Sequence, residues 1–147
     1  MGLEQAINQH KFRNEYQKAT INIIYTSNFL QQQFKTLLEP ADITTQQFNI
    51  LRILRGESPL STLQIRERML DKMSDTSRLV ERLLKKGLLE KKSCKFDKRL
   101  VDVTITEKGL ALLAELDASA NKLDSIISNL TPAEAKQLNE LLDKARG

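Results

Sequence analysis

Five consecutive residues near the middle of the chain carry side chains suited to polar contacts with a partner. They are Ser74, Asp75, Thr76, Ser77 and Arg78, and the apolar residues that follow at helical spacing place them at the start of a helix. The first turn of a helix has free backbone N–H groups and the positive end of the helix dipole, and both favour a phosphate. Arginine can donate two parallel hydrogen bonds to guanine, so Arg78 is the residue here best suited to reading a base.

Basic residues continue along the same predicted helix. Arg82, Lys85 and Lys86 fall on its outer face, where contacts to phosphates are expected more than contacts to base edges. The chain has 23 Lys and Arg against 19 Asp and Glu, a net charge of +4. Residues 61–105 hold twelve basic and seven acidic residues, a net charge of +5, so the rest of the chain is −1. Such a local basic field is typical of a surface that binds polyanions, although a solvated lysine-rich surface would give the same count.

The composition excludes several classes of function. With one Cys and one His, the chain has no internal disulfide, no multi-Cys or His-rich metal site and no triad that needs two imidazoles. It contains no Gly-rich phosphate loop, H-E-x-x-H, C-x-x-C or nucleophile elbow, so we expect no metal, no cofactor and no enzymatic activity. No apolar run approaches the roughly 20 residues that span a bilayer, and residues 1–13 lack the apolar region of a signal peptide. A cytoplasmic protein without a membrane partner is therefore expected.

Hydrophobic periodicity predicts a mainly α-helical fold with one β-hairpin. The expected helices cover about residues 4–38, 44–56, 61–69, 74–86, 106–128 and 131–145. Alternating residues predict strands at about 89–94 and 101–105. Ser74 is the expected N-cap of the fourth helix, and Gly87 its C-terminal glycine. This order of elements predicts a winged helix-turn-helix flanked by long helices, whose second helix would lie in the major groove of DNA.

Three motifs resemble those of the MarR family of winged-helix regulators. The stretch 74–89 is similar to the family's recognition helix and to the Gly-Leu that leads into the wing. The Asp-Lys-Arg at 97–99 resembles its D-x-R wing tip, and residues 103–109, ending in T-E-K-G, resemble the close of the wing. These motifs at this spacing are specific, and the resemblance covers nearly the whole chain. Lys91 departs from the Arg that many members carry, and Ile105 replaces the usual Leu.

The resemblance implies a regulator that binds double-stranded DNA. Arg99 would enter the minor groove, because the negative potential of a narrow A·T-rich groove suits a lone Arg. Asp97 would support Arg99 through a charge-assisted hydrogen bond. The alternative is an ordinary surface ion pair in a polar turn, which the preceding helix-turn-helix disfavours. The expected DNA contacts come from Ser61, Thr62, Ser74, Asp75, Thr76, Ser77, Arg78, Arg82, Lys85, Lys95, Lys98 and Arg99.

The resemblance also implies an obligate homodimer with interlocking terminal helices. We expect a single MarR-like domain over 1–147, with a DNA-binding lobe at 44–105 and helical dimerisation regions at 1–38 and 107–147. The long apolar stripe of the first helix agrees, since it exceeds what a small winged helix covers. A two-fold dimer predicts a pseudo-palindromic operator with half-sites about one turn apart.

Many family members bind small aromatic effectors in a cleft between the dimerisation helices and the DNA-binding lobe. Tyr16, Tyr25 and Phe29 could line such a cleft, although core or interface packing is the alternative. His10 is expected to be exposed. Cys94 lies near several cations that could favour its thiolate and a redox role, but an inert strand residue is the simpler interpretation.

The sequence therefore predicts a dimeric DNA-binding transcriptional regulator, expected to act as a repressor that an effector releases. The alternative is a winged-helix module that binds protein. Such a module would be expected to lack the polar start of helix 74–86 or the wing Arg, and both are present.

Overall fold

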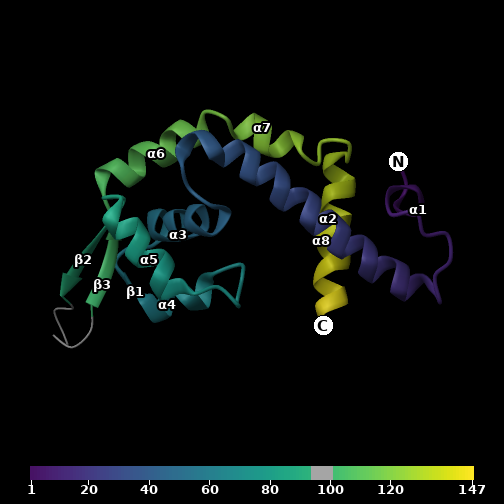
Figure 1. The fold of residues 1–147 in the computed structure, drawn as a ribbon, viewed down its shortest axis with the longest axis horizontal. Coiled ribbons are helices and arrows are strands. Elements are labelled where there is room, and N and C mark those ends of the chain that lie inside the picture. Colours follow the sequence, from purple (N-terminus) through teal and green to yellow (C-terminus); the bar gives the residue numbers. More distant parts are fainter. Residues whose placement is uncertain (94–100) are drawn as a thin grey trace. The chain divides into compact units, whose positions relative to one another are not determined.

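The computed structural model describes residues 1–93 and 101–147, and it is mainly helical with a small antiparallel sheet (Figure 1), which confirms the predicted fold class. The chain separates into two compact units, Met1–Thr45 and Gln46–Gly147. In the described part of the chain, every helix is too short or too polar to span a bilayer.

The first unit contains two helices where the sequence predicts one. Its elements are α1 (Leu3–Ala6), α2 (Glu15–Leu38) and the 3-10 helix η1 (Glu39–Ala41). The helix predicted over 4–38 is therefore wrong at 7–14. Asn8 has a left-handed φ of 50°, and the Asn14 side chain caps α2 by accepting a hydrogen bond from the Gln17 backbone N–H at 2.9 Å. Asn bonds readily to nearby backbone groups in such non-helical conformations, and this competes with a continuous helix.

The winged helix-turn-helix is built around a small apolar core. Its elements are α3 (Thr45–Gly56), β1 (Leu60–Ser61), α4 (Thr62–Arg68), α5 (Thr76–Lys85), β2 (Leu89–Ser93) and β3 (Val101–Ile105). Ile50, Leu54, Ile65, Leu83 and Val103 are each at most 1% exposed and come from α3, α4, α5 and β3. Burial of these side chains is the main stabilisation that holds α5 in place.

The sheet has one strand more than the sequence predicts. Its order is β1-β3-β2, and all pairs are antiparallel. Val103 lies opposite Leu60 on one side and Lys91 on the other. The hairpin of β2 and β3 was expected, but β1 has only two residues, which is too short to show an alternating pattern.

Three helices follow the wing. They are α6 (Glu107–Asp117), α7 (Ala120–Ser125) and α8 (Pro132–Arg146). The single helix predicted over 106–128 is wrong, because it breaks at Ala118 and Ser119. Asp117, Ser119 and Asn121 surround this break, and such side chains compete with helical backbone hydrogen bonds. Thr106 caps α6, and Thr131 forms a capping box with Glu134 at the start of α8. The Thr131 backbone N–H and hydroxyl bind the Glu134 carboxylate and lower its pKa.

Candidate nucleic-acid interface

α5 begins one residue later than the sequence predicts. Its N-cap is Asp75, whose Oδ1 accepts a hydrogen bond from the Arg78 backbone N–H at 3.2 Å. The prediction of Ser74 as the cap is wrong, and Ser74 lies in the preceding turn with its Oγ 3.3 Å from Thr76 Oγ1. Ser and Asp rank equally as N-caps, so residue type alone could not decide between them. The Asp carboxylate adds a favourable interaction with the positive end of the helix dipole.

A surface hollow of about 450 Å³ lies beside the start of α5. It is lined by Thr62, Leu63 and Arg66 and by Ser74, Asp75, Thr76 and Ser77. The hollow therefore brings together five of the residues expected to contact DNA. Leu63 and Arg66 were missed, although Arg66 follows Thr62 by four residues and must lie on the same face of α4.

The side chains around this hollow differ in exposure. Ser77 is exposed, and the Arg78 side chain is 71% exposed with its Nε 3.9 Å from Asp75 Oδ2. So long and exposed an ion pair is weak, so the guanidinium can bind other acceptors at little cost. Thr76 is only 3% exposed, which places most of its side chain in the protein interior.

Two further cations lie along α5. Arg82 and Lys85 are exposed, and with Arg78 they follow the i, i+4, i+7 spacing of one helix face. The inner face of α5 is apolar: Leu79, Val80 and Leu83 are buried, and Leu84 is half-buried. α5 therefore presents three exposed cations on the side away from the core.

The C-terminal end of α5 is closed by the predicted glycine. Gly87 has a φ of 74°, and its N–H donates to the Leu84 carbonyl at 3.0 Å. The Leu88 N–H donates to the Leu83 carbonyl at 3.1 Å. These two bonds form a Schellman motif, which requires the left-handed residue that Gly87 supplies.

One acidic side chain of α5 is paired with the wing. Glu81 Oε1 lies 2.8 Å from Lys91 Nζ on β2. The Lys91 ammonium holds the pKa of the Glu81 carboxyl below its ordinary value, mainly through this hydrogen bond. The pair joins α5 to the wing and neutralises a negative charge on the basic helix.

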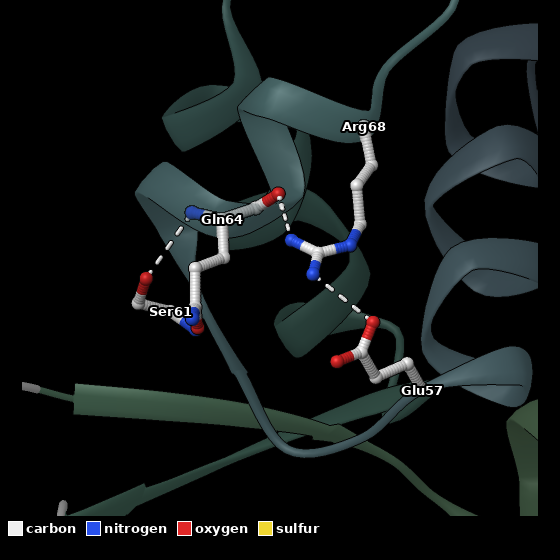
Figure 2. A network of polar contacts seen from close by, with 4 residues as sticks. All are labelled: Glu57, Ser61, Gln64 and Arg68. Carbon is white, nitrogen blue, oxygen red and sulfur yellow. Dashed lines mark hydrogen bonds and ion pairs between the residues drawn. The ribbon is translucent and has the colours of Figure 1, made fainter.

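Ser61 belongs to a polar network at the start of α4 (Figure 2). Its Oγ accepts from the Gln64 N–H at 3.1 Å, and Gln64 Oε1 accepts from the Ser61 N–H at 2.9 Å, so the two residues form a capping box. Arg68 donates to the Gln64 carbonyl and pairs with Glu57, each at 3.0 Å (Figure 2). Arg68 therefore joins α4 to the end of α3, although its type and position would also suit a phosphate contact.

Several predicted residues lie outside the described part of the chain. They are Lys95, Asp97, Lys98 and Arg99 of the wing, together with Cys94. The described wing strands carry Lys91 and Lys92, which are both exposed.

The aromatic residues expected to line an effector cleft are on α2. Tyr16 is 85% exposed, Tyr25 44% and Phe29 45%. Tyr16 borders a shallow hollow with Arg13, Asn14 and Gln17, to which Tyr25 and Phe29 do not contribute. His10 is exposed, as expected.

Known proteins resemble this chain in both sequence and fold. The MarR family profile matches residues 41–100. The transcriptional regulator MgrA of Staphylococcus aureus is 30% identical over 103 residues, which are 70% of this chain and 69% of MgrA. A mutant of Escherichia coli MarR in complex with operator DNA superposes with a TM-score of 0.82 and 25% identity, over 92% of this chain and 99% of that one.

A further structural relative shares the fold. It is Bordetella bronchiseptica BpsR, from a structure concerned with regulation of its DNA binding by 6-hydroxynicotinic acid. It gives a TM-score of 0.78 with 24% identity, over 88% of this chain and 99% of BpsR. With these matches, the chain belongs to the MarR family of DNA-binding transcriptional regulators, which is a class of regulators and not of enzymes.

Proposed function

We propose that this protein is a sequence-specific repressor that binds a pseudo-palindromic operator as a homodimer. In this proposal α5 lies in the major groove, with Ser77 and Arg78 at base edges and Arg82 and Lys85 at phosphates. Thr76 acts by positioning, since its side chain is buried. Ser61, Thr62, Ser74 and Arg66 contact DNA phosphates beside the hollow. The Asp75 carboxylate only accepts hydrogen bonds, so its proposed contact is to a base amino group such as that of cytosine.

The single observation that carries this proposal is the hollow at the start of α5. Polar groups of two helices meet there next to the exposed Arg78, and the cations at 82 and 85 continue from it along one face. This combination fits base contacts flanked by phosphate contacts. It also matches the element that helix-turn-helix proteins place in the major groove.

The proposed dimer rests on apolar side chains that the single chain leaves exposed. α2 carries Ile23, Ile24, Tyr25 and Phe29, which are between 44% and 57% exposed, and α8 carries Leu138 and Leu141, at 40% and 56%. Repeated large apolar side chains on a helix surface mark an interaction site. A second copy of the chain would cover them with the regions 1–38 and 107–147.

We further propose that a small aromatic effector releases the DNA. Tyr16, Tyr25 and Phe29 would contribute to its site in the dimer. Regulation of BpsR by 6-hydroxynicotinic acid supports this by analogy of fold.

Selection of bound duplexes from genomic fragments tests the function. We expect a palindromic duplex, bound by a dimer, with an affinity that falls steeply as salt is raised. Arg82→Gln and Lys85→Gln should each reduce the slope of log affinity against log salt by about 1, because each removes one phosphate contact. Failure to select any duplex at low salt would favour the protein-binding alternative. Loss of the protein should raise transcription from the promoter that contains the selected site, and lowered transcription would contradict repression.

The wing is tested separately. Arg99→Ala should weaken binding to duplexes with A·T-rich flanks while the dimer stays intact by light scattering. Unchanged affinity in a gel shift would exclude the proposed role of Arg99 in the minor groove.

A further inference from the structure

The end of α5 that lies away from the proposed base contacts is fastened to the start of α6. Thr106, the N-cap of α6, donates its hydroxyl to the Gly87 carbonyl at 2.8 Å. Its backbone N–H donates to the Leu88 carbonyl at 3.1 Å. The same Thr106 oxygen accepts from the Gly109 N–H at 3.1 Å, so one hydroxyl serves both helices.

Lys108 adds a second connection. Its Nζ donates to the Lys86 carbonyl at 2.9 Å. Lys86 is the C-cap of α5, so this ammonium binds a carbonyl at the negative end of the helix dipole. A Cβ at Gly87 would lie 4.0 Å from Lys108 Cδ and Nζ, so the Lys108 side chain lies across the glycine turn.

Gly109 brings the two elements close together. A Cβ at this position would lie 2.5 Å from the Leu88 carbonyl oxygen and 2.7 Å from Ile105 Cγ1. Only glycine fits such an approach without a shift of backbone. Thr106, Lys108 and Gly109 together therefore hold residues 86–88 against the first turn of α6.

The position of this contact matters because of what each helix does in the proposed function. α5 enters one half-site, and α6 belongs to the region proposed to form the dimer. The angle between α5 and α6 therefore determines how far apart the two copies of α5 lie in the dimer. In two-fold helix-turn-helix dimers that distance selects the spacing of half-sites.

We propose that Thr106 and Lys108 are positioning residues for DNA recognition: their contacts to residues 86–88 fix the angle of α5 to α6 and so set the half-site spacing that the dimer accepts. This inference rests on the proposed function. It assigns roles to residues outside the proposed DNA contacts. Those roles concern the choice between half-site spacings, whereas the residues at the start of α5 act on the choice between bases.

The test compares three variants of the full chain on matched duplexes. Lys108→Met removes the donor but keeps the length of the side chain, and Lys108→Arg keeps a donor. Lys122→Met, on α7, is a control for the loss of one positive charge. The duplexes share the selected half-sites and differ by one base pair added or removed at the centre. The measured quantity is the ratio of Kd values between the altered and the selected spacing.

We expect Lys108→Met to reduce this ratio by about fivefold, the scale of one net hydrogen bond. Lys108→Arg and Lys122→Met should keep the wild-type ratio. Loss of charge, or of folded protein, weakens binding to every duplex alike and cancels in the ratio. A wild-type ratio for Lys108→Met would overturn the proposal, and so would an equal fall with Lys122→Met.

Amide hydrogen exchange in the free protein provides a second measurement that does not depend on DNA. The Gly87 and Leu88 N–H groups are hydrogen-bonded at the end of α5, and Lys108→Met should accelerate their exchange severalfold by easing local opening. Unchanged exchange would show that Lys108 does not hold this end, which overturns the proposal. A wild-type protein that bound no duplex would overturn the proposed function and the spacing role, while the exchange result would still decide whether Lys108 holds the helix.

Discussion

At its N-terminal end α5 is held by the Asp75 cap and the buried Thr76 side chain, whereas at its C-terminal end it is held by backbone, side-chain and steric contacts from the start of α6. The first end has Asp75 as its cap and an Arg78 side chain that is 71% exposed. The second has the Schellman bonds of Gly87 and Leu88 and the donors of Thr106 and Lys108. One helix thus has a lightly held end and a firmly held end.

This difference fits a helix that must recognise a partner in a fixed orientation. Polar groups that are only weakly engaged can form new hydrogen bonds without leaving a buried group unsatisfied. Orientation, in contrast, requires contacts that persist in the free protein. Changes at the C-terminal end should therefore affect stability and geometry, and changes at the N-terminal end should affect affinity and choice of base.

The largest effect on stability is expected at the held end. Gly109→Ala should destabilise the fold by about 3 kcal/mol, because its Cβ would overlap the Leu88 carbonyl oxygen and Ile105. Thermal or urea unfolding measures the change. Gly56→Ala is the matched control: a Cβ there meets no described atom within 4 Å, and as the last residue of α3 it should stabilise the fold by at most about 1 kcal/mol. Equal effects of the two substitutions would contradict the close packing of α6 on residue 88.

At the N-terminal end of α5, the largest effect of a substitution should be on DNA binding. Arg78→Ala should leave the unfolding midpoint unchanged, since its ion pair with Asp75 is long and exposed. Its affinity for the selected duplex should fall by roughly 2 kcal/mol, with relaxed preference at one guanine. Titration of the selected duplex and of one with that guanine replaced checks this result. A uniform loss on both duplexes would instead assign Arg78 to a phosphate.

Two substitutions of Asp75 distinguish its role as the cap of α5 from the effect of its negative charge on DNA binding. Asp75→Ala should destabilise the protein by about 1 kcal/mol, because the Arg78 N–H loses its acceptor. Asp75→Asn keeps an acceptor and should retain nearly full stability, while it removes a negative charge beside the proposed DNA surface. Unfolding and duplex titrations of both variants measure the two effects. Equal stability of the Ala and Asn variants would show that the cap contributes little.

Local sequence signals were sufficient to predict most of the helices and the turn into the wing. Apolar periodicity located α3, α4 and α5, and the glycine at 87 located the turn into the wing. The failures occurred where short polar residues compete with the helix, at 7–14 and at 118–119, and in β1, where two residues show no period. These are places where tertiary context decides between conformations of similar local energy.

The candidate DNA-binding site could also be predicted only in part, because some contacts around it depend on tertiary packing. Residue types and helical spacing indicated the exposed cations of α5, and the i, i+4 spacing from Thr62 could have added Arg66, but neither could identify Lys108. Lys108 binds a carbonyl 22 residues earlier in the chain, so its partner follows from tertiary packing. Likewise, Arg68 and Arg78 look alike in sequence, yet Arg68 is engaged by Glu57 and Gln64.

The smallest effect is expected between the two ends, at the Glu81–Lys91 pair. Lys91 lowers the pKa of Glu81 from its ordinary value of 4.5, so folding favours the ionised carboxylate. This contribution is present above pH 4.5 and is lost as the pH falls through the lowered pKa. Both side chains are about half exposed, so the effect should be slight and reduced by salt.

The difference in unfolding midpoint between wild type and Glu81→Gln measures this contribution without the other carboxylates. We expect the difference to be constant from neutral pH to about 4.5 and to shrink below it. In the Lys91→Met background the same substitution should lose this pH dependence, because the partner that lowers the pKa is absent. If the difference shrank equally in both backgrounds, Lys91 would not be its cause. DNA affinity then distinguishes two effects of the Glu81–Lys91 pair. Glu81→Gln should strengthen DNA affinity if only the negative charge of Glu81 matters. It should weaken DNA affinity if the pair orients the wing on α5.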